Sequence, residues 1–77
     1  MKLTQYDVVK VTQIRRRDAF RPAPFNRRAP QIGDIATILE VYTKPPGYEL
    51  ECSDEHGITE WLDGFKADDI ELELVRQ

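Results

Sequence analysis

The side chains that most often perform nucleophilic or metal chemistry are scarce in this chain, which holds one histidine, His56, and one cysteine, Cys52. A zinc site needs about four such ligands, and a nucleophilic cysteine needs an activating base beside it. Cys52 falls at an inward position of an alternating segment, where an inert buried thiol is expected, and His56 falls in an acidic turn. We therefore predict no metal site, no cofactor and no enzymatic activity.

Carboxylates are numerous, but their spacing is typical of structure rather than of catalysis. Five glutamates alternate with apolar residues, as on the solvated face of a strand: Glu49, Glu51, Glu60, Glu71 and Glu73. A pair of them would act as general acid and base only in a pocket that shifts their pKa values. We expect this acidic surface to provide solubility or to meet a basic patch on a partner.

The most unusual stretch is residues 15–30, RRRDAFRPAPFNRRAP, which holds six of the seven arginines and three prolines. Residues 15–28 carry a net charge of +5, whereas residues 29–77 carry −9 and the whole chain −3. Guanidinium groups bind carboxylates and phosphates, and phenylalanines anchor interfaces or stack on bases. The candidate partner-binding residues are Arg15, Arg16, Arg17, Phe20, Arg21, Phe25, Arg27 and Arg28.

Several interpretations of this basic segment remain open. It could dock a protein partner, bind nucleic acid, pair with the chain's own acids, or meet the acidic surface of a second copy. In the self-pairing case, residues 15–17 would reach Glu49, Glu51 or Glu73. Nucleic-acid domains are usually basic throughout, but the pI here is about 5.0, so protein docking is favoured. The prolines would reduce the entropy lost on binding.

The segments flanking this loop have the β-branched, alternating character of short strands. Strands are expected over residues 6–14, 35–42, 48–52, 58–62 and 70–74. Turn residues separate them at 31–34, 44–47 and 53–57, and residues 63–69 are expected to form a single 3-10 turn with Phe65 or Ala67 inward. Residues 75–77 are expected to be a free end. The chain is thus predicted to be one all-β domain, 1–77, a small five-stranded barrel, because closure removes edge strands.

This order of parts resembles an SH3-like barrel, with residues 15–30 as the long loop between strands 1 and 2 and a 3-10 turn before the last strand. Four stretches resemble a family of small bacterial SH3-like proteins of unknown function: YDVV at 6–9, GDIATILEVY at 33–42, YELEC at 48–52 and ADDI at 67–70. The family pattern is roughly D-V-V, G-x-x-G-T-I-V-x-V-Y, Y-x-V-E-F and L-x-x-D-L. Ala36 stands where that pattern has glycine, and the loop is longer and more basic. The resemblance implies a fold and no activity.

A looser resemblance, at the level of the fold, is to the E subunit of photosystem I and the variable subunit of ferredoxin-thioredoxin reductase. It implies a docking or stabilising role. Tyr42, Tyr48 and Trp61 form a candidate aromatic face, but the A-L-Y-D-Y stretch and W-W pair of peptide-binding SH3 domains are absent, so packing is favoured.

One cysteine and an N-terminus without an apolar run predict a cytoplasmic protein with no membrane partner. The predicted function is a non-catalytic binding module that docks onto a protein through its Arg/Phe/Pro-rich loop. The alternatives are a nucleic-acid accessory protein and an immunity-type or stabilising subunit of an enzyme complex. A homo-oligomer is a further alternative.

Overall fold

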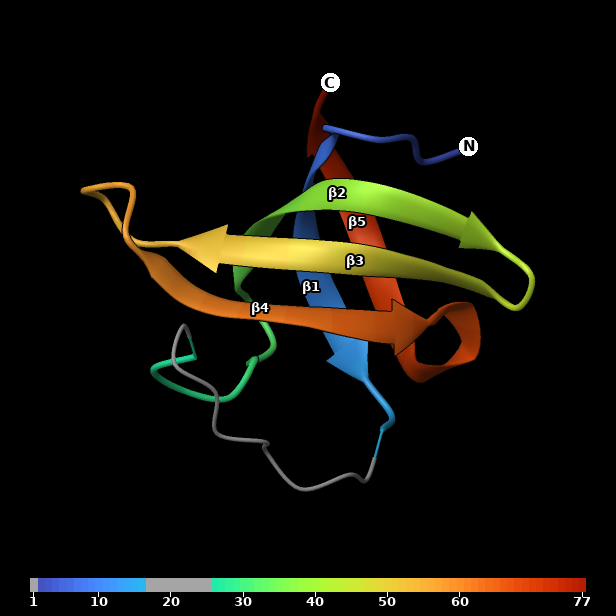
Figure 1. Ribbon diagram of the computed structural model, residues 1–77, viewed down its shortest axis with the longest axis horizontal. Helices are drawn as coiled ribbons and strands as arrows, with labels where there is room; N and C mark the ends of the chain where they lie inside the picture. The colour runs from blue at the N-terminus through green and yellow to red at the C-terminus, as the bar shows by residue number, and fades with distance from the viewer. Residues whose placement is uncertain (1, 17–25) are drawn as a thin grey trace.

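The computed structural model describes residues 2–16 and 26–77, through which five antiparallel strands run (Figure 1). The strand order in the sheet is β4-β3-β2-β1-β5. The all-β architecture, the long β1–β2 connection and the 3-10 turn before the last strand confirm the prediction at this level. The elements are β1 (Val8–Ile14), β2 (Ile35–Thr43), β3 (Pro46–Ser53), β4 (Thr59–Lys66), the 3-10 helix η1 (Ala67–Asp69) and β5 (Ile70–Arg76).

The core forms where two groups of strands face each other. Figure 1 shows the β2–β3–β4 ribbon crossing in front of β1 and β5 at a steep angle. Apolar residues at alternate positions of each strand point between them, because successive side chains of a strand face opposite sides. The buried cluster consists of Val9, Val11, Ala36, Ile38, Leu50, Cys52, Trp61, Phe65 and Ile70.

Strand β4 is longer than the sequence predicts. Its expected end was Leu62, but it continues through Asp63 and Gly64 to Lys66, and only residues 67–69 form the 3-10 turn. Cross-strand pairing explains the difference, since β3 pairs with residues 63–66 and holds them extended. Phe65 is buried at 4% exposure and its ring meets Trp61 edge-to-face at 6.1 Å between centroids.

Other boundaries shift for the same reason. The expected free end, residues 75–77, is strand as far as Arg76, which pairs with Val8 of β1. Just before the start of β1, Tyr6 has a φ of 72° and therefore precedes the strand. Gly57 has the positive φ that its turn was expected to need. Within the described residues, no helix has the length and apolar character needed to cross a bilayer.

Candidate functional site

The first end of the basic loop is attached to β4 and to the turn before β5. The backbone N–H of Arg15 donates to Asp69 O at 2.8 Å, and its guanidinium pairs with Glu71. Both side chains of that ion pair are about half exposed, so it contributes little stability.

Arg16 makes the stronger attachment at this end. Its guanidinium donates to the Asp63 carboxylate at 2.5 Å and to Gly64 O at 2.8 Å, and lies over the Phe65 ring at 4.3 Å. The Arg16 side chain is 21% exposed, so these contacts form in a partly dehydrated place. The charge, the hydrogen bonds and the cation–π contact together hold the loop at residue 16.

The returning end of the loop is attached to the same strand. Asn26 Oδ1 accepts the Leu62 N–H at 2.9 Å, and the Arg27 N–H donates to Glu60 O at 2.7 Å. Together with Gly64 O, these backbone groups belong to alternate residues of β4, which is an edge strand. Unpaired groups on an edge invite pairing with another chain. The two loop ends therefore cover the edge of β4 along residues 60–64.

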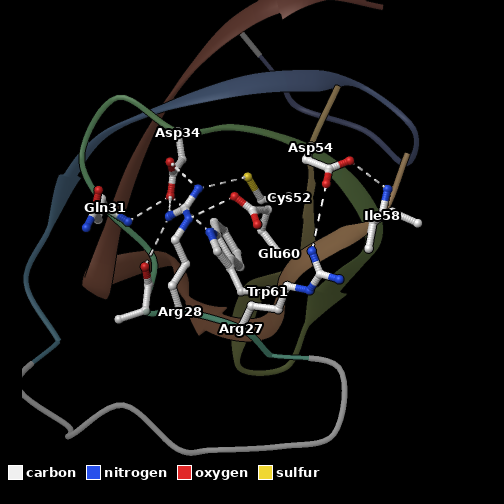
Figure 2. Close-up of polar contacts among 10 residues, drawn as sticks. Arg27, Arg28, Gln31, Asp34, Cys52, Asp54, Ile58, Glu60 and Trp61 are labelled. Atoms are coloured by element: carbon white, nitrogen blue, oxygen red, sulfur yellow. Dashed lines mark hydrogen bonds and ion pairs between the residues drawn. The ribbon is translucent and has the colours of Figure 1, made fainter. Parts of the chain in front are cut away.

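Arg28 is the centre of the densest polar network in the described structure (Figure 2). Its two terminal nitrogens bind the Asp34 carboxylate at 2.9 and 3.0 Å, a paired geometry that only a guanidinium offers. Its Nε donates to Glu60 at 3.1 Å, and one terminal nitrogen lies 3.7 Å from the Cys52 sulfur. One side chain of the loop thus joins Asp34, the residue before β2, to β3 and β4 at the point where the loop re-enters the fold.

Asp34 is the acceptor around which this network is built. Besides Arg28, its Oδ2 accepts the Trp61 indole N–H at 2.9 Å and the Gln31 backbone N–H at 2.8 Å. The carboxylate is positioned because Gly33, with a φ of 99°, turns the chain so that Gly33 and Asp34 both bond to Val11 of β1. The Trp61 side chain has no exposed surface, so its N–H needs this internal acceptor.

These contacts shift the pKa values of Asp34 and Arg28. Burial alone raises the pKa of Asp34, but hydrogen bonds from Arg28, Gln31 and Trp61 outweigh it and hold the pKa below its usual value. The hydrogen bond to Asp34 raises the pKa of Arg28 above its already high value. The pair is therefore fully ionised at neutral pH.

The lowered pKa of Asp34 predicts an acid-dependent stability. A carboxylate with a lower pKa in the folded than in the unfolded state stabilises the fold above its unfolded pKa of about 4, and this contribution is lost as pH falls through the folded pKa. We expect Asp34→Asn to be less stable than wild type by about 1–3 kcal/mol at neutral pH. The difference in the free energy of unfolding between wild type and Asp34→Asn should narrow toward about pH 3. Urea unfolding of both proteins across this range measures it.

A suitable control for the acid experiment is Glu55→Gln, because the Glu55 side chain is 87% exposed in the β3–β4 turn. Its stability should follow that of wild type at every pH. A constant gap between wild type and Asp34→Asn from neutral to acid pH would contradict the assignment of this titration to Asp34.

The structure supports self-pairing for the arginines it describes. Arg15, Arg16, Arg27 and Arg28 each pair with an acid of the same chain. For Arg15 and Arg16 the expected partners are corrected: they are Glu71 and Asp63 rather than Glu49, Glu51 or Glu73. The difference arises because the start of the loop lies beside the end of β4 and the turn before β5. Arg27 pairs with Asp54, and Arg28 with Asp34 and Glu60.

The other loop residues predicted to bind a partner lie outside the described residues, so their role stays a prediction; they are Arg17, Phe20, Arg21 and Phe25. Of the candidate aromatic face, Trp61 is fully buried and offers no surface to a partner, so packing is the interpretation that applies to it. Tyr48 is half-buried and packs against the core, whereas Tyr42 is 45% exposed. A binding role for these two tyrosines also stays a prediction.

Cys52 and His56 lie in different surroundings. Cys52 is buried as expected, and burial raises the pKa of its thiol, which keeps it protonated at neutral pH. His56 is 78% exposed in the β3–β4 turn. Among residues 2–16 and 26–77, no three His, Cys, Asp or Glu side chains are arranged to hold a metal ion.

Sequence reasoning missed Asp34 as the organising acid. The sequence predicts a turn at Gly33-Asp34 and places both residues in a stretch that resembles a family pattern, but it assigns the Asp34 side chain no role. A useful signal was present, since a single tryptophan in a buried strand needs an acceptor for its N–H, and an acid at the start of another strand is a natural candidate.

Comparison with known proteins adds no identification: no family model, no curated protein and no solved structure matches the chain.

Proposed function

We propose that this protein is a non-catalytic docking module that binds a protein partner through residues 17–25 of its basic loop. The observation that carries the proposal is the attachment of both loop ends to β4, through Arg16 on one side and Asn26 with Arg27 on the other. A segment tethered at two fixed points loses less entropy on binding than a free tail. Phe20, Arg21 and Phe25 supply the residue types enriched at interface hot spots.

We also propose that the five strands form an SH3-like barrel. The strand order β4-β3-β2-β1-β5, the β2–β3–β4 meander and the 3-10 turn before β5 support this proposal. So does the steep crossing of the meander over β1 and β5 (Figure 1). The likeness to the small bacterial SH3-like family remains a hypothesis based on its short motifs.

The charge distribution favours a protein over a nucleic acid as the partner. The four described arginines of the loop are already bound to carboxylates, and a phosphate would have to compete with these acids. Nucleic-acid binding draws most of its affinity from cations that are available to phosphates. The arginines at the loop ends are therefore assigned to holding the loop, and the central residues to binding.

The test is a pull-down from nuclease-treated lysate, with wild type beside a Phe20→Ala, Arg21→Ala, Phe25→Ala variant. Two exposed isoleucines elsewhere, Ile32 and Ile58, provide a matched control when both are changed to alanine. A protein retained by wild type and control but lost by the loop variant supports the proposal. Equal capture by all three proteins overturns it.

A second measurement separates the nucleic-acid alternative. The affinity of the recovered complex is measured between about 50 and about 200 mM salt, where a nucleic-acid binder with many phosphate contacts loses orders of magnitude. A protein interface anchored by phenylalanines changes far less over the same range. Loss of all binding after nuclease treatment assigns the loop to nucleic acid instead.

A further inference from the structure

A hollow of about 250 Å³ opens between the β2–β3 hairpin and the end of β4. In Figure 1 these elements meet on the right, whereas the β3–β4 turn lies at the opposite end of the meander. The hollow is thus separate from the network of Arg27 and Arg28. Its lining includes Tyr42, Lys44, Pro45, Pro46, Gly64 and Lys66.

Two glycines keep this hollow open. A Cβ at Gly47 would lie 2.4 Å from the backbone O of Phe65, so the sheet leaves no space for a side chain there. A Cβ at Gly64 would lie 2.9 Å from the Glu49 carboxylate. The two glycines therefore add no side chain to the lining, to which Tyr42 and Pro45 also contribute. This part of the hollow is shaped by the close approach of β3 and β4 rather than by adjustable side chains.

The Tyr42 ring is held in place by its neighbour in the sheet. Its hydroxyl donates to Glu49 Oε1 at 3.1 Å, and this hydrogen bond raises the pKa of Tyr42, so the hydroxyl stays a donor. Yet Tyr42 is 45% exposed, which leaves its apolar ring available on the side of the hollow. An exposed, oriented aromatic ring beside prolines is a suitable contact for an apolar side chain.

The charge around the hollow is positive, in contrast to the rest of the chain. Lys44 and Lys66 line it, and the Glu49 carboxylate beside the lining residues accepts the hydrogen bond from Tyr42. An adjoining hollow, which shares Tyr42, Pro46 and Gly47, adds Lys2 and no acid. No ion pair between described residues involves these three lysines, whereas all four described arginines of the loop are paired. Three of the five exposed cations without an ion pair to a described residue thus lie at or beside this hairpin, and the other two are Lys10 and Arg76.

We propose that the hollow binds an acidic peptide segment of a partner protein, with one bulky apolar side chain against Tyr42 and the prolines and carboxylates at Lys44 and Lys66. The volume is below the roughly 300–1,000 Å³ of pockets for drug-sized ligands, so it suits one side chain of a peptide. Charge complementarity selects the acidic class. This proposal does not depend on the docking role of the basic loop, and either can fail without the other.

The experiment is a titration of the full chain, followed by amide chemical shifts, with a short acetylated peptide carrying one phenylalanine flanked by glutamates. The companion probe is the same peptide with glutamines in place of glutamates. We expect the acidic peptide to shift the amide signals of residues 42–44, 47 and 64–66, and the glutamine peptide to bind at least about tenfold more weakly. Equal binding of both peptides, shifts elsewhere on the sheet, or no binding overturns the proposal.

Charge reversal tests the lysines directly. Lys44→Glu with Lys66→Glu should weaken the acidic peptide by more than about tenfold. Both side chains are exposed, and a dispersed amide spectrum confirms that the variant is folded. Lys10→Glu with Arg76→Glu is the matched control, because it changes the net charge by the same amount and both side chains are exposed and do not line the hollow. An equal loss of affinity in the control variant would show that only net charge matters and would overturn the assignment.

Discussion

Trp61→Ala is expected to lose a large share of the stability of the fold and to unfold at a far lower urea concentration than wild type. Trp61 is fully buried and the largest side chain of the core. Removing such a side chain costs about 3–5 kcal/mol through lost burial and the cavity left behind. The whole stability of a 77-residue chain is roughly 4–12 kcal/mol. The variant also removes one hydrogen-bond donor from Asp34, which adds to the loss.

Trp61→Phe separates the packing of Trp61 from its hydrogen bond. A phenylalanine ring retains much of the contact with Phe65 but has no N–H for Asp34. We expect this variant to fold and to lose about 1–3 kcal/mol. Urea unfolding followed by circular dichroism is the measurement, because Trp61 is the only tryptophan and both variants lack its fluorescence. A wild-type midpoint for Trp61→Ala would contradict the assigned core.

Arg28→Ala is expected to cost about 2–3 kcal/mol, somewhat below the cost of breaking a fully buried pair because the Arg28 side chain is 32% exposed. The change leaves Asp34, whose side chain is only 12% exposed, without its charged partner. Glu60 loses a partner as well. The loss arises less from the missing attraction than from a carboxylate left partly dehydrated.

The adjacent arginine provides a matched control. Arg27→Ala removes an identical side chain from the same loop end, but its ion pair with Asp54 is 3.9 Å long and the Arg27 side chain is 60% exposed. We expect a cost below about 1 kcal/mol. Arg28→Lys should recover only part of the loss, since an ammonium does not bind Asp34 and Glu60 in the same paired geometry. Equal midpoints for the Arg27 and Arg28 variants would contradict the network.

The local alternation of apolar and charged residues was enough to predict the strands. Val9 and Val11 with exposed Lys10 in β1, and Leu72 and Leu74 alternating with Glu71 and Glu73 in β5, show this pattern clearly. Alternation works because each strand buries one face, which is a local property of the sequence. Turn residues such as Gly57 were equally informative, since a positive φ is a property of the residue itself.

The sequence by itself therefore determined the strand-rich class, the approximate strand positions, the long basic connection and the buried place of Cys52. The tertiary structure decided which acid each arginine meets. Arg28 reaches Asp34 and Glu60, and Arg16 reaches Asp63, because both ends of the loop lie along β4. It also decided that Asp63 and Gly64 are strand rather than turn, since β3 pairs with them. Ion-pair partners and strand ends depend on contacts with residues that are distant in the sequence, and a local sequence pattern does not specify those contacts.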